Sequence, residues 1–116
     1  MQLSNKQIVQ KVNDAFSANK MEDFVAHCTD DVRWTMIGDK EYIGKEAILK
    51  SMSGMDVQPV FNNGQIIADG DQVASNGTFS MQNKDGSMYN AAFCDVYNFS
   101  NGKITNLISY VVELKD

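Results

Sequence analysis

The second half of the chain alternates apolar and polar residues between turn sequences, and this pattern constrains the fold more than any other feature. Alternation with a period of two is typical of β-strands. Turn residues gather at positions 69–71, 83–86 and 101–102, and the last pair, Asn-Gly, is among the strongest short hairpin signals. The pattern predicts a long antiparallel meander that begins near Val57, where Pro59 suits an edge strand or a bulge.

Helical spacing dominates the first half of the chain. Ser4 and Gln7 have the spacing of a capping box, and apolar residues then recur on one helical face. Asn19 and Glu22 repeat the capping signal before a second, short helix. The apolar stripe of that helix consists of Met21, Phe24, Val25 and Cys28. The acidic pair at 30–31 is expected to end it.

A short strand and a third helix complete the first half. Residues 32–36 predict the strand, and a turn follows around positions 38–39. The third helix is expected to begin after Gly44 and to stop near Gly54. Its inward residues are Ala47, Ile48 and Met52. Helices that precede such a meander predict an α+β domain in which they cover one face of the sheet.

The length and the charge of the chain exclude several classes. A chain of 116 residues suits one domain, residues 1–116, which can bury roughly two thirds of its unfolded surface. With 15 acidic and 10 basic residues and no basic cluster, neither nucleic acid nor a membrane surface is expected as a partner. No apolar run approaches the roughly 18 residues of a membrane span. Two cysteines, Cys28 and Cys94, without an apolar leader predict a reduced, cytoplasmic protein.

Turn chemistry decides which side chains share the inner face of the meander. If residues 84–86 form a three-residue loop with Gly86 in the left-handed conformation, Asn83 pairs with Ser87 and Asp95 lies opposite Ser75. The inner face then collects Val73, Gly77, Phe79, Met81, Tyr89, Ala91, Phe93 and Tyr97. A two-residue loop would mix apolar with polar residues, so the three-residue loop is preferred.

The register of the last strand follows from the turn at residues 101–102. A two-residue turn places Ile108 opposite Asp95 and Tyr110 opposite Phe93. The alternate face of this strand is also apolar, so the pattern leaves open which face is buried. In either case Asp95 is the single acidic residue expected in the middle of the concave face.

Asp95 is therefore the candidate catalytic residue. A carboxylate surrounded by rings is costly to ionise, so it is either satisfied by a partner or kept protonated for chemistry. The structural alternative is that it hydrogen-bonds to Ser75 or to a tyrosine hydroxyl and only completes a pocket wall. Candidate ligand-binding residues are Trp34, Met36, Tyr42, Phe79, Phe93, Tyr97 and Tyr110. Aromatic residues at strand spacing are, however, more often core filling.

Metal and cofactor sites are not predicted. His27 is the single histidine, and its neighbour Cys28 would point about 100° away from it on a helix, so the two cannot chelate one metal ion. The chain also has no phosphate loop, dinucleotide fingerprint or metal cluster.

Taken in order, residues 8–31, Trp34, residues 44–48 and residues 94–104 resemble the NTF2-like superfamily, and within it the SnoaL-like polyketide cyclases and ketosteroid isomerase. The resemblance covers nearly the whole chain. It implies a cystatin-like α+β cone, in which three N-terminal helices pack on a strongly curved antiparallel sheet and enclose a pocket. It also implies a homodimer that assembles through the outer face of the sheet.

The resemblance carries over to function only in part. Asp95 matches the aspartic acid that donates a hydrogen bond in the oxyanion hole of ketosteroid isomerase. The tyrosine of that oxyanion hole aligns with Val12 and the general base aligns with Met36, which argues against steroid isomerisation. A SnoaL-like cyclase needs only an acid/base carboxylate in an apolar pocket, and Asp95 meets that requirement.

The resemblance thus implies cofactor-free cyclase or isomerase chemistry on a small hydrophobic ligand. The alternative is a non-catalytic module that binds a ligand or a protein on the same scaffold. In a third interpretation, side chains fill the pocket and the role of the protein depends on its dimer alone.

Overall fold

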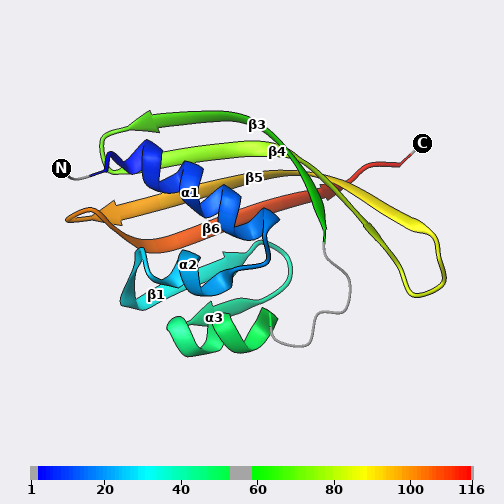
Figure 1. The fold of residues 1–116 in the computed structure, drawn as a ribbon, viewed down its shortest axis with the longest axis horizontal. Coiled ribbons are helices and arrows are strands. Elements are labelled where there is room, and N and C mark those ends of the chain that lie inside the picture. The colour runs from blue at the N-terminus through cyan, green and yellow to red at the C-terminus, as the bar shows by residue number, and fades with distance from the viewer. Residues whose placement is uncertain (1–2, 53–58, 116) are drawn as a thin grey trace.

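The computed structural model describes residues 3–52 and 59–115, and Figure 1 shows their arrangement. Within these residues, three helices and six strands follow one another along the chain. They are α1 (Asn5–Ser17), α2 (Met21–Val25), β1 (Cys28–Met36), β2 (Glu41–Ile43), α3 (Lys45–Met52), β3 (Val60–Asp69), β4 (Gln72–Gln82), β5 (Met88–Ser100) and β6 (Lys103–Glu113). None of the helices among the described residues is long and apolar enough to cross a membrane.

The start of α1 confirms the predicted capping box, whereas the predicted cap of α2 is wrong. The Ser4 hydroxyl accepts from the Gln7 backbone N–H at 3.1 Å, and the Gln7 side chain accepts from the Ser4 N–H at 2.8 Å. Asn19 does not cap α2; it has a left-handed conformation with φ 57° and lies just beyond α1. The N–H groups of Asn19 and Lys20 donate to carbonyls of the last turn of α1. Asn19 therefore completes a Schellman end to α1.

The strand predicted at 32–36 is longer, and a further strand was not predicted. β1 begins at Cys28, so the acidic pair at 30–31 lies within a strand and does not end α2. The exposed carboxylates face solvent there, which a strand allows as readily as a helix end. β2 pairs with β1 after the expected turn. α3 begins after Gly44 as predicted, whereas its expected end near residue 54, the side chain of Met52 and the expected start of the meander at Val57 lie outside the described residues.

The six strands form one curved sheet in the order β2-β1-β6-β5-β4-β3 (Figure 1). The α+β class is confirmed, but the sheet is mixed and not wholly antiparallel, because β1 runs parallel to β6. β1 belongs to the helical half of the chain and joins the sheet beside its last strand. A connection that includes four other strands and a helix is long enough to allow a parallel pair.

The predicted register of the β4–β5 hairpin is confirmed. Gly86 has φ 90°, and the Asn83 N–H donates to the Ser87 carbonyl at 2.7 Å across the three-residue loop. Asp95 consequently lies opposite Ser75, as expected.

The predicted register of β6 is wrong beyond its first two residues. The two-residue turn forms as expected, with Ser100 opposite Lys103. Thr105 then interrupts the ladder as a bulge, and its hydroxyl donates to the Asn98 carbonyl at 3.1 Å. One extra residue exchanges the two faces of a strand. Asp95 therefore lies opposite Ser109, and not opposite Ile108.

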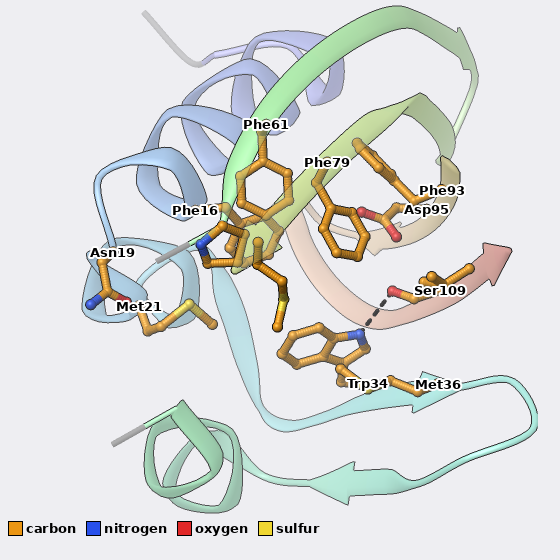
Figure 2. A pocket seen from close by; sticks show the side chains of 13 residues that line it. Phe16, Asn19, Met21, Trp34, Met36, Phe61, Phe79, Phe93, Asp95 and Ser109 are labelled. Atoms are coloured by element: carbon orange, nitrogen blue, oxygen red, sulfur yellow. Dashed lines mark hydrogen bonds between the residues drawn. The ribbon is translucent and has the colours of Figure 1, made fainter. Parts of the chain in front are cut away.

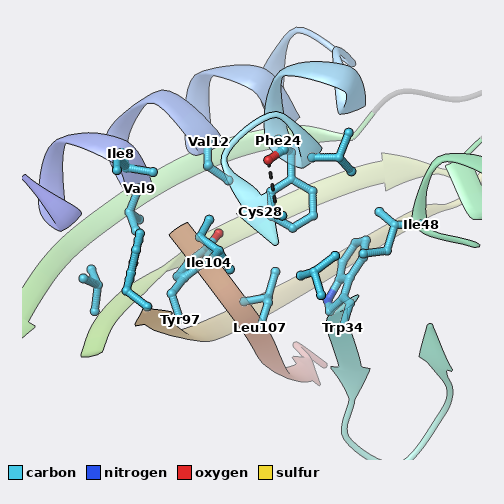
Figure 3. Packing of buried hydrophobic residues seen from close by; sticks show 14 of the residues in the cluster. Ile8, Val9, Val12, Phe24, Cys28, Trp34, Ile48, Tyr97, Ile104 and Leu107 are labelled. Atoms are coloured by element: carbon cyan, nitrogen blue, oxygen red, sulfur yellow. Dashed lines mark hydrogen bonds between the residues drawn. The ribbon is translucent and has the colours of Figure 1, made fainter. Parts of the chain in front are cut away.

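The helices cover one face of the sheet and enclose the core with it. α1 contacts β3 and β4, while α2 and α3 contact β1. Figure 3 shows side chains of the helices and of the sheet packed together, among them Val12 of α1, Phe24 of α2, Tyr97 of β5 and Leu107 of β6. None of these four is exposed to solvent. Burial of each such side chain contributes about 1.5–3 kcal/mol to folding.

Candidate functional site

A cavity of about 230 Å³ lies beside this core, between the helices and the concave face of the sheet. Figure 2 shows the side chains around it. Its walls are mostly aromatic rings and methionines, supplemented by few polar groups. The lining residues are Phe16, Asn19, Met21, Trp34, Met36, Pro59, Phe61, Phe79, Met81, Phe93, Asp95, Ser109 and Val111.

Strand alternation on β5 places Asp95 at the boundary between the core and the cavity. Tyr97, two residues further along the same face, is part of the solid core, whereas Phe93, two residues earlier, lines the cavity. Phe93 meets Phe61 edge to face, with ring centroids 6.0 Å apart, and Phe79 lies 5.7 Å from Phe61. Such interlocked rings make a rigid apolar wall.

The carboxyl group of Asp95 is almost completely withdrawn from water. The side chain is 9 % exposed. Burial raises the pKa of Asp95 from 3.8 to about 6, and a hydrogen bond from the Ser109 hydroxyl partly offsets the rise. A carboxyl with this pKa exists in both protonation states near neutral pH, which suits it to donate or to accept a proton.

The partner of Asp95 differs from the one expected. Ser109, and not Ser75 or a tyrosine hydroxyl, forms the hydrogen bond to the carboxyl group. Ser109 also accepts a hydrogen bond from Trp34 Nε1 at 2.9 Å, drawn as the dashed line in Figure 2. Ser75 instead accepts from Asn13 Nδ2 at 3.1 Å.

The structure places most of the predicted site residues along the cavity wall. These are Trp34, Met36, Phe79, Phe93 and Asp95. Tyr42, Tyr97 and Tyr110 lie elsewhere. Tyr42 is half-buried on β2, where its ring lies 6.1 Å from that of Trp34.

Tyr97 and Tyr110 are displaced from the predicted site for different reasons. Tyr97 is completely buried in the core, and its hydroxyl has no hydrogen-bond partner within the described part of the chain. Burial, with a further contribution from Asp95, raises its pKa well above 10. Tyr110 is 46 % exposed on the outer face of the sheet, because the bulge at Thr105 turned its strand over.

Sequence reasoning missed Ser109 for the same reason, and it left open whether the alternate face of the strand, which carries Val111, lines the pocket. A two-residue turn without a bulge points both side chains outward, and no residue type around Thr105 signalled the extra residue. Phe16 of α1 and Phe61 of β3 were also not predicted at the site. The helical periodicity of α1 was the signal that could have directed Phe16 toward the concave face.

Neither a reactive thiol nor a cluster of metal ligands accompanies Asp95 among the described residues. Burial raises the pKa of the Cys28 thiol to about 12, and its sulfur donates to the Phe24 carbonyl at 3.3 Å. A thiol in that state is a poor nucleophile. Among residues 3–52 and 59–115, no three His, Cys, Asp or Glu side chains come together as a metal site.

Solved structures with the same fold cover nearly the whole chain. An NTF2-like protein of unknown function from Cytophaga hutchinsonii is 22 % identical, with 94 % of this chain and 100 % of that chain covered and a TM-score of 0.75. A candidate polyketide cyclase from Xanthomonas campestris is 18 % identical, with 92 % of each chain covered and a TM-score of 0.80. A candidate ketosteroid isomerase from Kribbella flavida is 15 % identical, with 97 % and 80 % covered and a TM-score of 0.79. At these identities the likeness shows the fold alone.

The family of the chain is identified by its sequence. No curated protein matches it significantly. The family model of the SnoaL-like domain, however, matches residues 9–107, which is most of the chain. Together with the NTF2-like fold of its structural neighbours, this match shows that the chain belongs to the SnoaL-like domain family.

Proposed function

We propose that the protein binds a small, flat hydrophobic molecule in the cavity and that Asp95 acts on it as an acid and base, without a cofactor. The observation that carries the proposal is the position of Asp95. It is the one acidic side chain among the described lining residues, and it is buried at the boundary between the core and a mostly apolar cavity. Perturbed carboxyl groups in such clefts are enriched at functional sites.

The walls of the cavity favour a particular class of ligand. Its volume of about 230 Å³ lies below the roughly 300–1,000 Å³ of sites for drug-sized molecules, which favours a small ligand. Aromatic rings favour flat ring systems, and three flexible methionines, Met21, Met36 and Met81, can adapt to the outline of the ligand. Sugars and nucleotides need more polar partners than these walls provide.

A single carboxyl group supports a proton shuttle. In the proposed reaction, ionised Asp95 takes a proton from a carbon next to a carbonyl, and the electron pair of that C–H bond moves toward the carbonyl oxygen. The neutral acid then returns the proton to another atom of the same molecule, so that the reaction is a net isomerisation or cyclisation. A pKa near 6 serves both steps.

A non-catalytic binding protein is the second candidate, and the cavity contains the observation that favours it. Met36 lines the wall at the position that aligns with the general base of ketosteroid isomerase, and Val12 is completely buried in the core. Neither side chain can donate or accept a proton. A binding module would need the aromatic cavity and would need no second acid.

A ligand screen followed by isotope exchange tests the proposal and separates the two candidates. Flat polyketide-like and steroid-like ketones should raise the melting temperature, because they bind the native state alone, whereas sugars and nucleotides should not. Bound ketones incubated in D₂O should then exchange hydrogen beside the carbonyl, as observed by NMR. Asp95→Asn should abolish the exchange and retain binding.

The outcomes differ clearly. Binding without exchange would leave the non-catalytic module. Stabilisation only by nucleotides or polyanions would contradict both candidates. Equal exchange by the parent and by Asp95→Asn would remove Asp95 from the chemistry.

A further inference from the structure

A row of three polar side chains crosses the otherwise apolar inner face of the sheet. Ser75 of β4, Asp95 of β5 and Ser109 of β6 are directly opposite one another in the two ladders. All three are buried, and with Asn13 of α1 they are the buried polar side chains of the described residues. The buried polarity is therefore gathered around a single carboxyl group.

Each serine at the ends of this row accepts a hydrogen bond from a side-chain nitrogen. The Asn13 amide nitrogen donates to the Ser75 oxygen, and the Trp34 indole nitrogen donates to the Ser109 oxygen. An indole N–H has no acceptor capacity, so the direction of the second bond is fixed. Because the Ser109 oxygen accepts from Trp34, its own hydrogen is left for another acceptor.

That acceptor is Asp95. Ser109 lies directly opposite Asp95 in the β5–β6 ladder and lines the same cavity, and its side chain hydrogen-bonds to the carboxyl group. Ser75, opposite Asp95 in the β4–β5 ladder, is completely buried and is not among the residues that line the cavity. The environment of Asp95 is thus asymmetric, although the two flanking residues are chemically identical.

We propose that Trp34 and Ser109 are positioning residues, which commit one oxygen of Asp95 to accepting from Ser109 and so place the acid proton on the other oxygen, facing the cavity. Figure 2 shows the arrangement, in which the Trp34 indole, the Ser109 hydroxyl and the Asp95 carboxyl follow one another along the wall. The assignment deepens the proposed function and rests on it. It makes neutral Asp95 a donor toward the ligand, and ionised Asp95 a base with one oriented oxygen.

Other titratable groups near this part of the core do not complicate the assignment. Tyr97, on the same face of β5, interacts with Asp95, and Cys28 of β1 interacts in turn with Tyr97. The pKa of Tyr97 lies well above 10 and that of Cys28 is about 12. Both therefore stay neutral between pH 4 and 8, while Asp95 titrates.

The test is an NMR titration of the ligand-free protein. Trp34 is the single tryptophan of the chain, so its indole N–H signal is unambiguous. In the parent protein this signal should shift with the same midpoint as the Asp95 carboxyl carbon, near pH 6. Ser109→Ala should raise the carboxyl midpoint by about one pH unit, because it removes a donor to the charged form. The indole signal should then cease to follow the titration.

Two further variants separate positioning from simple packing. Trp34→Phe keeps a ring but frees the Ser109 hydroxyl to accept from neutral Asp95, so the carboxyl midpoint should also rise. Ser75→Ala makes the same chemical change on the opposite side of Asp95. It leaves the Asn13 amide without its hydrogen-bond acceptor. It should lower stability and leave the midpoint in place.

The assignment is overturned if the parent indole signal ignores the Asp95 titration, if Ser109→Ala leaves the midpoint unchanged, or if Ser75→Ala raises it equally. The indole measurement needs no variant, so it decides the matter even where a variant fails to fold. None of these measurements uses a ligand. A ligand screen that finds no binding compound would therefore count against the proposed function alone. An unchanged midpoint of the Asp95 titration in Ser109→Ala would count against this assignment alone.

Discussion

The Asp95 carboxyl group makes the stability of the protein depend on pH in an unusual direction. Its folded pKa of about 6 exceeds the ordinary value of 3.8, so the folded state holds this proton more tightly than the unfolded chain. The stability that the group contributes is complete below pH 3.8 and is lost as the pH rises through about 6. The shift corresponds to about 3 kcal/mol.

Asp95→Asn should therefore become more stable relative to the parent as the pH rises. Asparagine keeps the size of the side chain and an oxygen that can accept from Ser109, but it cannot ionise. Between pH 4 and 8 the difference in the free energy of unfolding should move in favour of the variant by about 2 kcal/mol. Urea unfolding of both proteins across that range measures it.

Asp95→Ala is the matched control. It removes the same ionisation and should show the same dependence on pH, at a lower overall stability because the Ser109 hydroxyl loses its acceptor. An asparagine variant that is less stable than the parent by the same amount at every pH would identify Asp95 as an ionised, well-paired structural residue.

Two neighbouring hairpins show what could be read from the sequence and what could not. In β4–β5, Gly86 marked the loop, and the contrast between an apolar and a polar face left one coherent register. In β5–β6 both faces of the second strand are apolar, so hydrophobicity did not report the bulge at Thr105. The helices, the meander and Asp95 were therefore predictable, whereas Ser109, the partner of Asp95, was not.

The β3–β4 pair contains a close approach that only glycine permits. Gly77 lies opposite Phe93 on the cavity side, and a Cβ atom at this position would lie 2.5 Å from the Asn62 carbonyl oxygen of β3. Backbone on the neighbouring strand cannot move aside as a flexible side chain can. Gly77→Ala should therefore lower the free energy of unfolding by about 1–3 kcal/mol.

Chemical unfolding of Gly77→Ala beside Ser80→Ala tests this expectation. Ser80 is a half-buried residue on the other face of the same strand. Its replacement by alanine should change the stability by less than about 1 kcal/mol. Equal effects of the two variants would show that β3 yields at this point and that the approach is not tight.

The corrected register of β6 also changes the surface of the whole molecule. Tyr110 and Val112 lie opposite Cys94 and Ala92, and so join the outer face of the sheet that the helices leave uncovered. Tyr110 is 46 % exposed and Val112 is 65 % exposed. Contiguous exposed apolar residues on a sheet mark an interaction surface more often than chance.

We therefore expect a homodimer that pairs this outer face with its own copy about a two-fold axis. Sedimentation at micromolar concentration should give about twice the monomer mass. Tyr110→Glu should shift the protein to the monomer, because a carboxylate in the interface would lose its hydration without gaining a partner.

Leu3→Glu supplies the control, since Leu3 is 39 % exposed just before α1, and that helix packs on the opposite face of the sheet. It should leave the sedimentation unchanged. A parent protein that sediments as a monomer would show that the outer face of the sheet is not a dimer interface. Dissociation by both variants would point to an interface that includes the segment before α1. Loss of the dimer with Tyr110→Glu alone would explain why a tyrosine that is absent from the cavity is nevertheless held in the centre of the sheet.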